Sequence, residues 1–63
     1  MKNPFTYWRR RREQDRIASE HARRYGMLSE YRMARRAGLS PIEALEDWDL
    51  LTPQLRALLS ELT

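Results

Sequence analysis

The chain contains no valine, and its remaining β-branched residues are two isoleucines and three threonines. Strands favour β-branched and aromatic residues, whereas alanine, leucine, arginine and glutamate, which dominate this sequence, favour helices. Local propensity is therefore helical along nearly the whole chain. The sequence predicts an all-α fold, either a small helical hairpin or a mini-bundle of three to four helices.

Turn and capping residues divide the chain into segments. Gly38 is suited to end a helix, and Ser40 and Glu43 have the spacing of a capping box that begins the next one. Thr52 and Pro53 form a second pair of cap and first-turn residue. The predicted helices span residues 4–25, 29–37, 41–51 and 53–62 of one small domain, residues 1–63.

The sequence around Gly26 leaves two interpretations open. One interpretation is a single long helix, because apolar and aromatic positions continue through Gly26 at helical spacing. These positions are Ile17, His21, Tyr25, Leu28 and Tyr31. A break is favoured by an internal echo, because Ala-Arg-Arg-Tyr-Gly at residues 22–26 returns as Ala-Arg-Arg-Ala-Gly at residues 34–38. On that basis the two segments are two helix ends of the same kind.

The length of 63 residues limits the core. A domain of this size hides only about 60% of the surface that its unfolded chain exposes, so small domains usually add disulfides, a metal or oligomerisation. The chain has no cysteine, and its single histidine, His21, gives no support for a structural zinc site. We therefore expect no cofactor, and we expect a second copy or another protein to complete the fold.

Charge is divided between the two halves of the chain. Residues 1–36 carry eleven basic and four acidic side chains, whereas residues 37–63 carry one basic and five acidic ones. The resulting charges of +7 and −4 indicate association, either of the two halves with each other or of the basic half with an anionic partner.

The first candidate site is an aromatic and arginine cluster at the start of the first helix. Cations beside aromatic rings suit RNA or single-stranded DNA, because arginines contact phosphates while bases stack on the rings. The alternative is a solvated basic helix whose aromatics fix its N-terminus and whose arginines pair with acids nearby along the helix. The candidate residues for an anionic partner are Tyr7, Trp8, Arg9, Arg10, Arg11, Arg12 and Arg16.

The second candidate site is an apolar stripe in the C-terminal half. From Ala44 to Leu62 it follows a heptad pattern, which Thr52 and Pro53 interrupt, and Leu45 and Leu59 flank it. Its simplest interpretation is a core face, but on so small a chain part of it is also a candidate surface for self-association or a partner. The candidate interface residues are Trp48, as the anchor, with Leu51, Leu55, Leu58 and Leu62.

Other classes of protein are disfavoured. Residues 30–49 have the length of a helix-turn-helix motif, but its recognition helix would present acids to DNA, namely Glu43, Glu46, Asp47 and Asp49. The sequence contains no catalytic constellation and no phosphate-binding or calcium-binding loop, so we expect no enzyme and no small-molecule substrate. Because no apolar run has the length of a signal or membrane span, we expect a cytoplasmic protein without a membrane partner.

We therefore expect a small non-enzymatic helical interaction or regulatory protein that binds itself or another protein. The alternative prediction is nucleic-acid binding, to RNA or DNA, through the N-terminal helix. One structural observation discriminates between them: whether residues 9–12 lie free on the surface or are covered by the acids of residues 43–49.

Overall fold

The computed structural model describes residues 4–62, except for the side chains of residues 4, 5 and 7. This described part forms the helices α1 (Pro4–Arg24), α2 (Leu28–Arg36), α3 (Pro41–Asp47) and α4 (Pro53–Glu61), and it contains no strand. The prediction of an all-α fold is confirmed.

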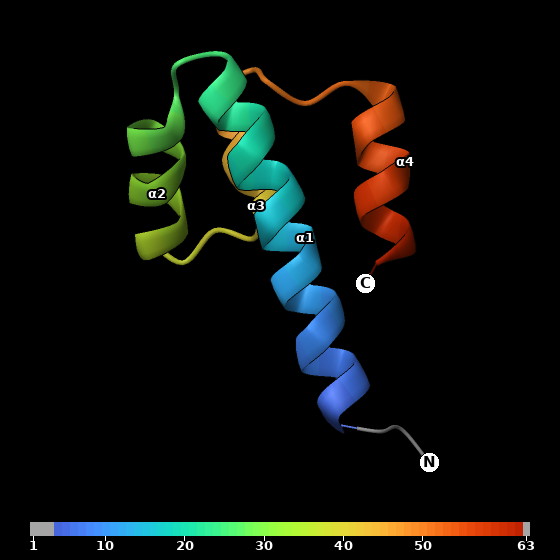
Figure 1. The fold of residues 1–63 in the computed structure, drawn as a ribbon. Coiled ribbons are helices and arrows are strands. Elements are labelled where there is room, and N and C mark those ends of the chain that lie inside the picture. Colours follow the sequence, from blue (N-terminus) through green and yellow to red (C-terminus); the bar gives the residue numbers. More distant parts are fainter. Residues whose placement is uncertain (1–3, 63) are drawn as a thin grey trace.

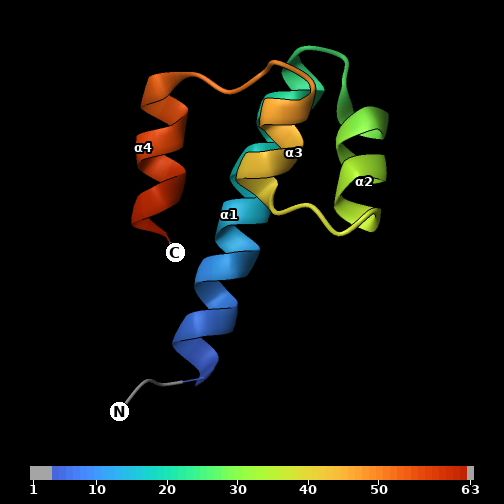
Figure 2. The same ribbon diagram turned by 180° about the vertical axis from the view of Figure 1, so that it is seen from behind.

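The longest helix, α1, contacts each of the other three described helices. The helices α2 and α3 also contact each other, whereas α4 lies along the opposite side of α1 from α2 (Figure 1). The N-terminal part of α1 extends past the ends of the other helices in both views (Figures 1 and 2). This helix therefore has a packed C-terminal part and a projecting N-terminal part.

The helices α1 and α2 end in the same backbone motif. Gly26 has a φ of 69°, and the amide of Met27 donates to the Ala22 carbonyl at 2.8 Å. Gly38 has a φ of 100°, and the corresponding hydrogen bond comes from the amide of Leu39. These are the hydrogen bonds of a Schellman motif, which needs a left-handed residue after the last turn. The chain thus breaks at Gly26, and the predicted similarity of the two helix ends is confirmed.

The helix α3 ends at Asp47, so the predicted end at residue 51 was wrong. Asp49 adopts the left-handed conformation, with a φ of 58°, and the amide of Leu50 donates to the Leu45 carbonyl at 2.9 Å. Aspartate tolerates this conformation better than most residues do. Because no glycine stands at this end, the sequence contains no strong signal for it.

The N-termini of α3 and α4 are capped as predicted. The Ser40 hydroxyl accepts a hydrogen bond from the Glu43 amide at 3.2 Å, and the Glu43 carboxylate accepts one from the Ser40 amide at 3.0 Å. This second hydrogen bond lowers the pKa of Glu43. At the start of α4, the Thr52 hydroxyl accepts from the Leu55 amide at 3.1 Å.

Alanine contributes much of the core. On α1 the buried side chains Gln14, Ala18 and Ala22 are four residues apart and form one face. The buried hydrophobic residues among those described are Ala18, Ala22, Tyr31, Ala34, Ala44, Leu45 and Leu59. Alanine allows helices to approach closely but removes little apolar surface from water, so the three larger residues dominate the burial.

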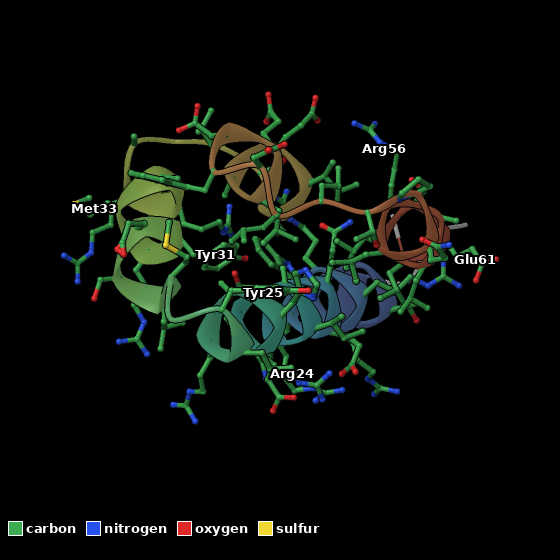
Figure 3. The ribbon with its side chains drawn as sticks, turned by 90° about the horizontal axis from the view of Figure 1, so that it is seen from above. Arg24, Tyr25, Tyr31, Met33, Arg56 and Glu61 are labelled. Atoms are coloured by element: carbon green, nitrogen blue, oxygen red, sulfur yellow. The ribbon has the colours of Figure 1, made fainter. Side chains whose placement is uncertain are left out.

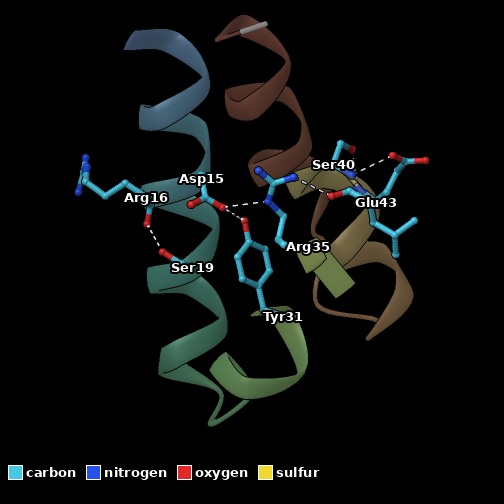
Figure 4. A network of polar contacts seen from close by, with 8 residues as sticks. Asp15, Arg16, Ser19, Tyr31, Arg35, Ser40 and Glu43 are labelled. Atoms are coloured by element: carbon cyan, nitrogen blue, oxygen red, sulfur yellow. Dashed lines mark hydrogen bonds and ion pairs between the residues drawn. The ribbon is translucent and has the colours of Figure 1, made fainter. Parts of the chain in front are cut away.

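A polar network joins α1 to α2 (Figure 4). The Tyr31 hydroxyl donates to a carboxylate oxygen of Asp15 at 2.6 Å, and Nε of Arg35 donates to the same oxygen at 3.1 Å. Nη1 of Arg35 also donates to the Leu39 carbonyl at 2.7 Å. The network therefore connects both helices to the loop that precedes α3.

Side chains of α1 also reach α4 and the segment before it. Nε2 of Gln14 donates to the Leu59 carbonyl at 2.9 Å. Nε2 of His21 lies 2.8 Å from the Leu50 carbonyl oxygen, which can only accept, so this nitrogen carries the proton. His21 therefore has a structural contact at the junction between α1 and the connection to α4.

Candidate functional site

The arginine arm, residues 9–12 of α1, lies in the part of the helix that extends past the other helices (Figure 1). The side chains of Arg9, Arg10, Arg11 and Arg12 are all exposed. Successive residues of an α-helix are rotated by about 100°, so four in a row point to all sides of its axis. The arm therefore presents cations around its circumference rather than along one face.

The arginine arm is preceded by Trp8, whose side chain is 62% exposed. The side chain of Tyr7, the other predicted aromatic residue, lies outside the described residues. Trp8 and Arg12 are one helical turn apart and share a face of α1. An exposed indole next to an arginine is a suitable surface for stacking an unpaired base.

Arg16, the last residue predicted for an anionic partner, is paired with an acid of its own helix. Both Nε and Nη2 of Arg16 donate to the Glu13 carboxylate, and this hydrogen bonding lowers the pKa of Glu13. Both side chains are well exposed. Exposed pairs of this kind are weak and are screened by salt, so an external anion can compete for Arg16.

The acids of residues 43–49 do not lie over the arginine arm. Glu43 caps α3, and Glu46 pairs with Arg56 of α4 at 2.8 Å. Seen from above, the carboxylate-tipped side chains of α3 point away from α1, and Arg24 of α1 lies on the other side of that helix (Figure 3). The acids of α3 are thus directed away from α1 rather than toward the arginine arm.

Two ion pairs bridge helices in the described part of the chain, and each lies within one half of the sequence. Asp15 pairs with Arg35 within the basic half of the sequence, and Glu46 pairs with Arg56 within the acidic half. These pairs do not join the two halves. Opposite charge in these pairs therefore stabilises contacts within each half, and the side chains of residues 9–12 are exposed rather than covered by the acids of residues 43–49.

The predicted apolar stripe does not form one helical face, because α3 ends at Asp47 and α4 begins at Pro53. Trp48 follows the last turn of α3 and is 37% exposed, and Leu58 of α4 is 46% exposed. The remaining predicted interface residues are half-buried: Leu51, Leu55 and Leu62. The buried leucine of α4 is Leu59, which flanked the predicted stripe.

Two of these leucines line a groove of about 280 Å³ between α4 and α1. Leu55 and Leu58 form its α4 side, and Ile17 and His21 contribute from α1. The remaining lining residues are charged: Arg16, Glu20 and Arg24. An apolar floor with a charged rim is a surface on which a short apolar segment could pack.

Several contacts that build the fold carry no signal in the sequence. They are the hydrogen bonds of Gln14 with Leu59, Asp15 with Tyr31 and His21 with Leu50. The partners are 45, 16 and 29 residues apart, so no local spacing identifies them. The available hint is the four-residue spacing of Tyr31 and Arg35, which places both on one face of α2.

Within residues 4–62, no three or more side chains of histidine, cysteine, aspartate or glutamate are grouped to hold a metal ion. None of the helices in that range is long and apolar enough to span a bilayer. Comparison of the chain with protein-family models, with curated proteins and with solved structures found no match. The candidate site is therefore defined by its own geometry and charge.

Proposed function

We propose that this protein is a non-enzymatic binding protein whose arginine arm contacts the phosphate backbone of a nucleic acid. The observation that carries the proposal is the exposure of Arg9, Arg10 and Arg12 on a helix end that extends past the other helices, while the acids of α3 point away. A cytoplasmic location stays a prediction from the composition.

A helix with cations on all sides suits a groove better than a flat surface, because phosphates line both sides of a groove. The major groove of B-DNA is about 12 Å wide and admits an α-helix. Single-stranded RNA or DNA would use the exposed Trp8 in addition, because unpaired bases stack on aromatic rings. In each case phosphate contacts supply the affinity, so binding weakens steeply as salt displaces them.

Fluorescence anisotropy with labelled single-stranded RNA, single-stranded DNA and duplex DNA, at salt between about 50 and 200 mM, tests the proposal. We expect the double variant R9Q/R12Q to lower the salt slope of the binding constant by about two units, because two phosphate contacts are lost. The matched variant R24Q/R56Q removes the same charge from exposed positions outside the arm and should leave the slope nearly unchanged. Failure of the unmodified protein to bind any of the three probes at the lower salt would overturn the proposal.

The second candidate function is association with a second copy or with another protein, which would complete a mini-bundle. It is supported by the partly exposed Trp48 and Leu58, and by a core whose largest fully buried side chains are Tyr31, Leu45 and Leu59. Binding energy at interfaces concentrates on a few large residues, with tryptophan prominent among them.

Light scattering at micromolar concentration tests this association. We expect a dimer or larger species that Trp48→Ala dissociates, whereas Trp8→Ala, at a more exposed tryptophan that precedes the arm, should leave it intact. A monomer whose capture of a protein partner is insensitive to Trp48→Ala would contradict this second candidate.

A further inference from the structure

A row of arginines follows the outer face of α1 from the arginine arm toward α2. The row consists of Arg9, Arg12, Arg16 and Arg23. Steps of three, four and seven residues keep these side chains on one face of the helix, away from the buried face. At a rise of 1.5 Å per residue, the row is about 21 Å long. The positive surface is therefore longer than the arm itself.

The row leads into a furrow between α1 and α2. Two depressions of about 200 and 310 Å³ adjoin there, and both are lined by Ser19 and Arg32. We define the basic furrow by the residues Arg16, Ser19, Arg23, Arg32 and Arg36. Arg16 and Arg23 come from α1, whereas Arg32 and Arg36, one turn apart, come from α2. Cations from two helices therefore border the two adjoining depressions.

The basic furrow keeps its positive charge because an acid in its lining is already compensated. Asp15 accepts hydrogen bonds from both Tyr31 and Arg35, and the Arg35 guanidinium balances its charge. Glu20 is the other acid of the two depressions. Against it stand three exposed arginines that form no ion pair with any described residue: Arg23, Arg32 and Arg36.

The basic furrow offers charge but no exposed ring. Tyr31, the aromatic residue in its lining, is only 2% exposed, and its hydroxyl is held by Asp15. The Ser19 hydroxyl donates to the Arg16 carbonyl at 3.0 Å, so its proton is also used. Contacts made in the furrow would therefore come from guanidinium groups, which match phosphate geometry, and contacts with phosphates carry no direct sequence information.

We propose that the phosphate backbone of a nucleic acid held by the arginine arm continues along this row into the basic furrow. The inference rests on the proposed function, because the arm supplies the first contact. A length of about 21 Å corresponds to about six nucleotides of one duplex strand at 3.4 Å each. Binding then depends on the length of the nucleic acid more than on its sequence.

The triple variant R23Q/R32Q/R36Q tests the furrow, by anisotropy with single-stranded oligonucleotides of about four and twelve nucleotides and with a duplex of about twelve base pairs. For the longer probe we expect the salt slope to fall by about two to three units, because three phosphate contacts are lost. For the shorter probe, which the arm alone covers, we expect the salt slope to fall by less than about one unit. The two probe forms identify whether the backbone belongs to a single strand or a duplex.

The outcomes separate the furrow from the arm. A lower salt slope in R9Q/R12Q together with an unchanged slope in R23Q/R32Q/R36Q would overturn the furrow and leave the arm in place. Absence of binding by the unmodified protein would overturn both. If circular dichroism shows that the triple variant does not fold, the single variants R32Q and R36Q replace it, each with an expected loss of about one unit of slope. An unchanged slope in both single variants would again reject the furrow.

Discussion

The Tyr31 hydroxyl on α2 donates a hydrogen bond of 2.6 Å to the carboxylate of Asp15 on α1. Tyr31 is one of the largest fully buried side chains, and Asp15 lines the depression that forms part of the basic furrow. Arg35 donates to the same oxygen and is thereby withdrawn from external anions. Asp15 thus stabilises the helix pair through its hydrogen bond with Tyr31. Through its contact with Arg35 it also determines which arginines around the furrow remain available.

Removing the Tyr31 hydroxyl should lower the stability of the fold. We expect Tyr31→Phe to decrease the free energy of unfolding by about 1–2 kcal/mol, because a partly buried hydrogen bond to a carboxylate is lost while the ring remains. Urea denaturation measures the change. Tyr25→Phe is the matched control, because Tyr25 is 61% exposed, and it should leave the urea midpoint unchanged. Equal effects of the two substitutions would contradict the assigned role of Tyr31.

Stability should also fall at high pH because of the same residue. Burial, and then the hydrogen bond to Asp15, raise the pKa of Tyr31 above its ordinary value of 10.0. The folded state therefore keeps the phenolic proton at a pH where the unfolded state loses it. The contribution of the protonated Tyr31 hydroxyl to the free energy of unfolding is complete below about pH 10 and is lost as pH rises further. Urea midpoints measured from about pH 8 to 11 should decline more steeply for the unmodified protein than for Tyr31→Phe; parallel declines would refute the assignment.

The attachment of α4 to α1 should depend on Gln14. Its side-chain amide is buried and donates to the Leu59 carbonyl at 2.9 Å, so Gln14→Leu removes this donor while keeping a side chain of similar size. We expect the free energy of unfolding to fall by about 1–2 kcal/mol. We also expect the substitution to accelerate hydrogen exchange more in α4 than in α2. Gln54→Leu, at an exposed position of α4, is the control. Unchanged exchange in α4 of Gln14→Leu would show that the hydrogen bond is dispensable.

The backbone conformation at two helix ends predicts that two substitutions change the stability in opposite directions. Gly38 has a φ of 100° and no atom within 4 Å of the place where a Cβ would stand, so Gly38→Ala should destabilise through the backbone alone, by about 1 kcal/mol. Asp49 has a φ of 58° in the equivalent position of α3, so Asp49→Gly should stabilise by up to about 1 kcal/mol. Urea midpoints that shift in the same direction for both would argue against a shared helix-ending motif.

The candidate site was only partly predictable. The identity of the arginines and their helical setting follow from the sequence, because four consecutive arginines on any α-helix point to all sides of it. Their exposure does not follow, because it depends on where α3 places its acids. Arg23, Arg32 and Arg36 were not predicted as a site, since the furrow that they border exists only when α1 and α2 pack together.

The sequence by itself determined the helical class and most of the helix ends. Gly26, Gly38, Ser40 and Thr52 act through hydrogen bonds that span no more than five residues, so the local chain contains both partners. The tertiary structure alone decided which face of α1 is buried, that Tyr31 meets Asp15, and that the carboxylates of α3 point away from α1. Those outcomes depend on contacts between residues far apart in the chain, where burial and packing compete among many pairings and local propensity does not choose.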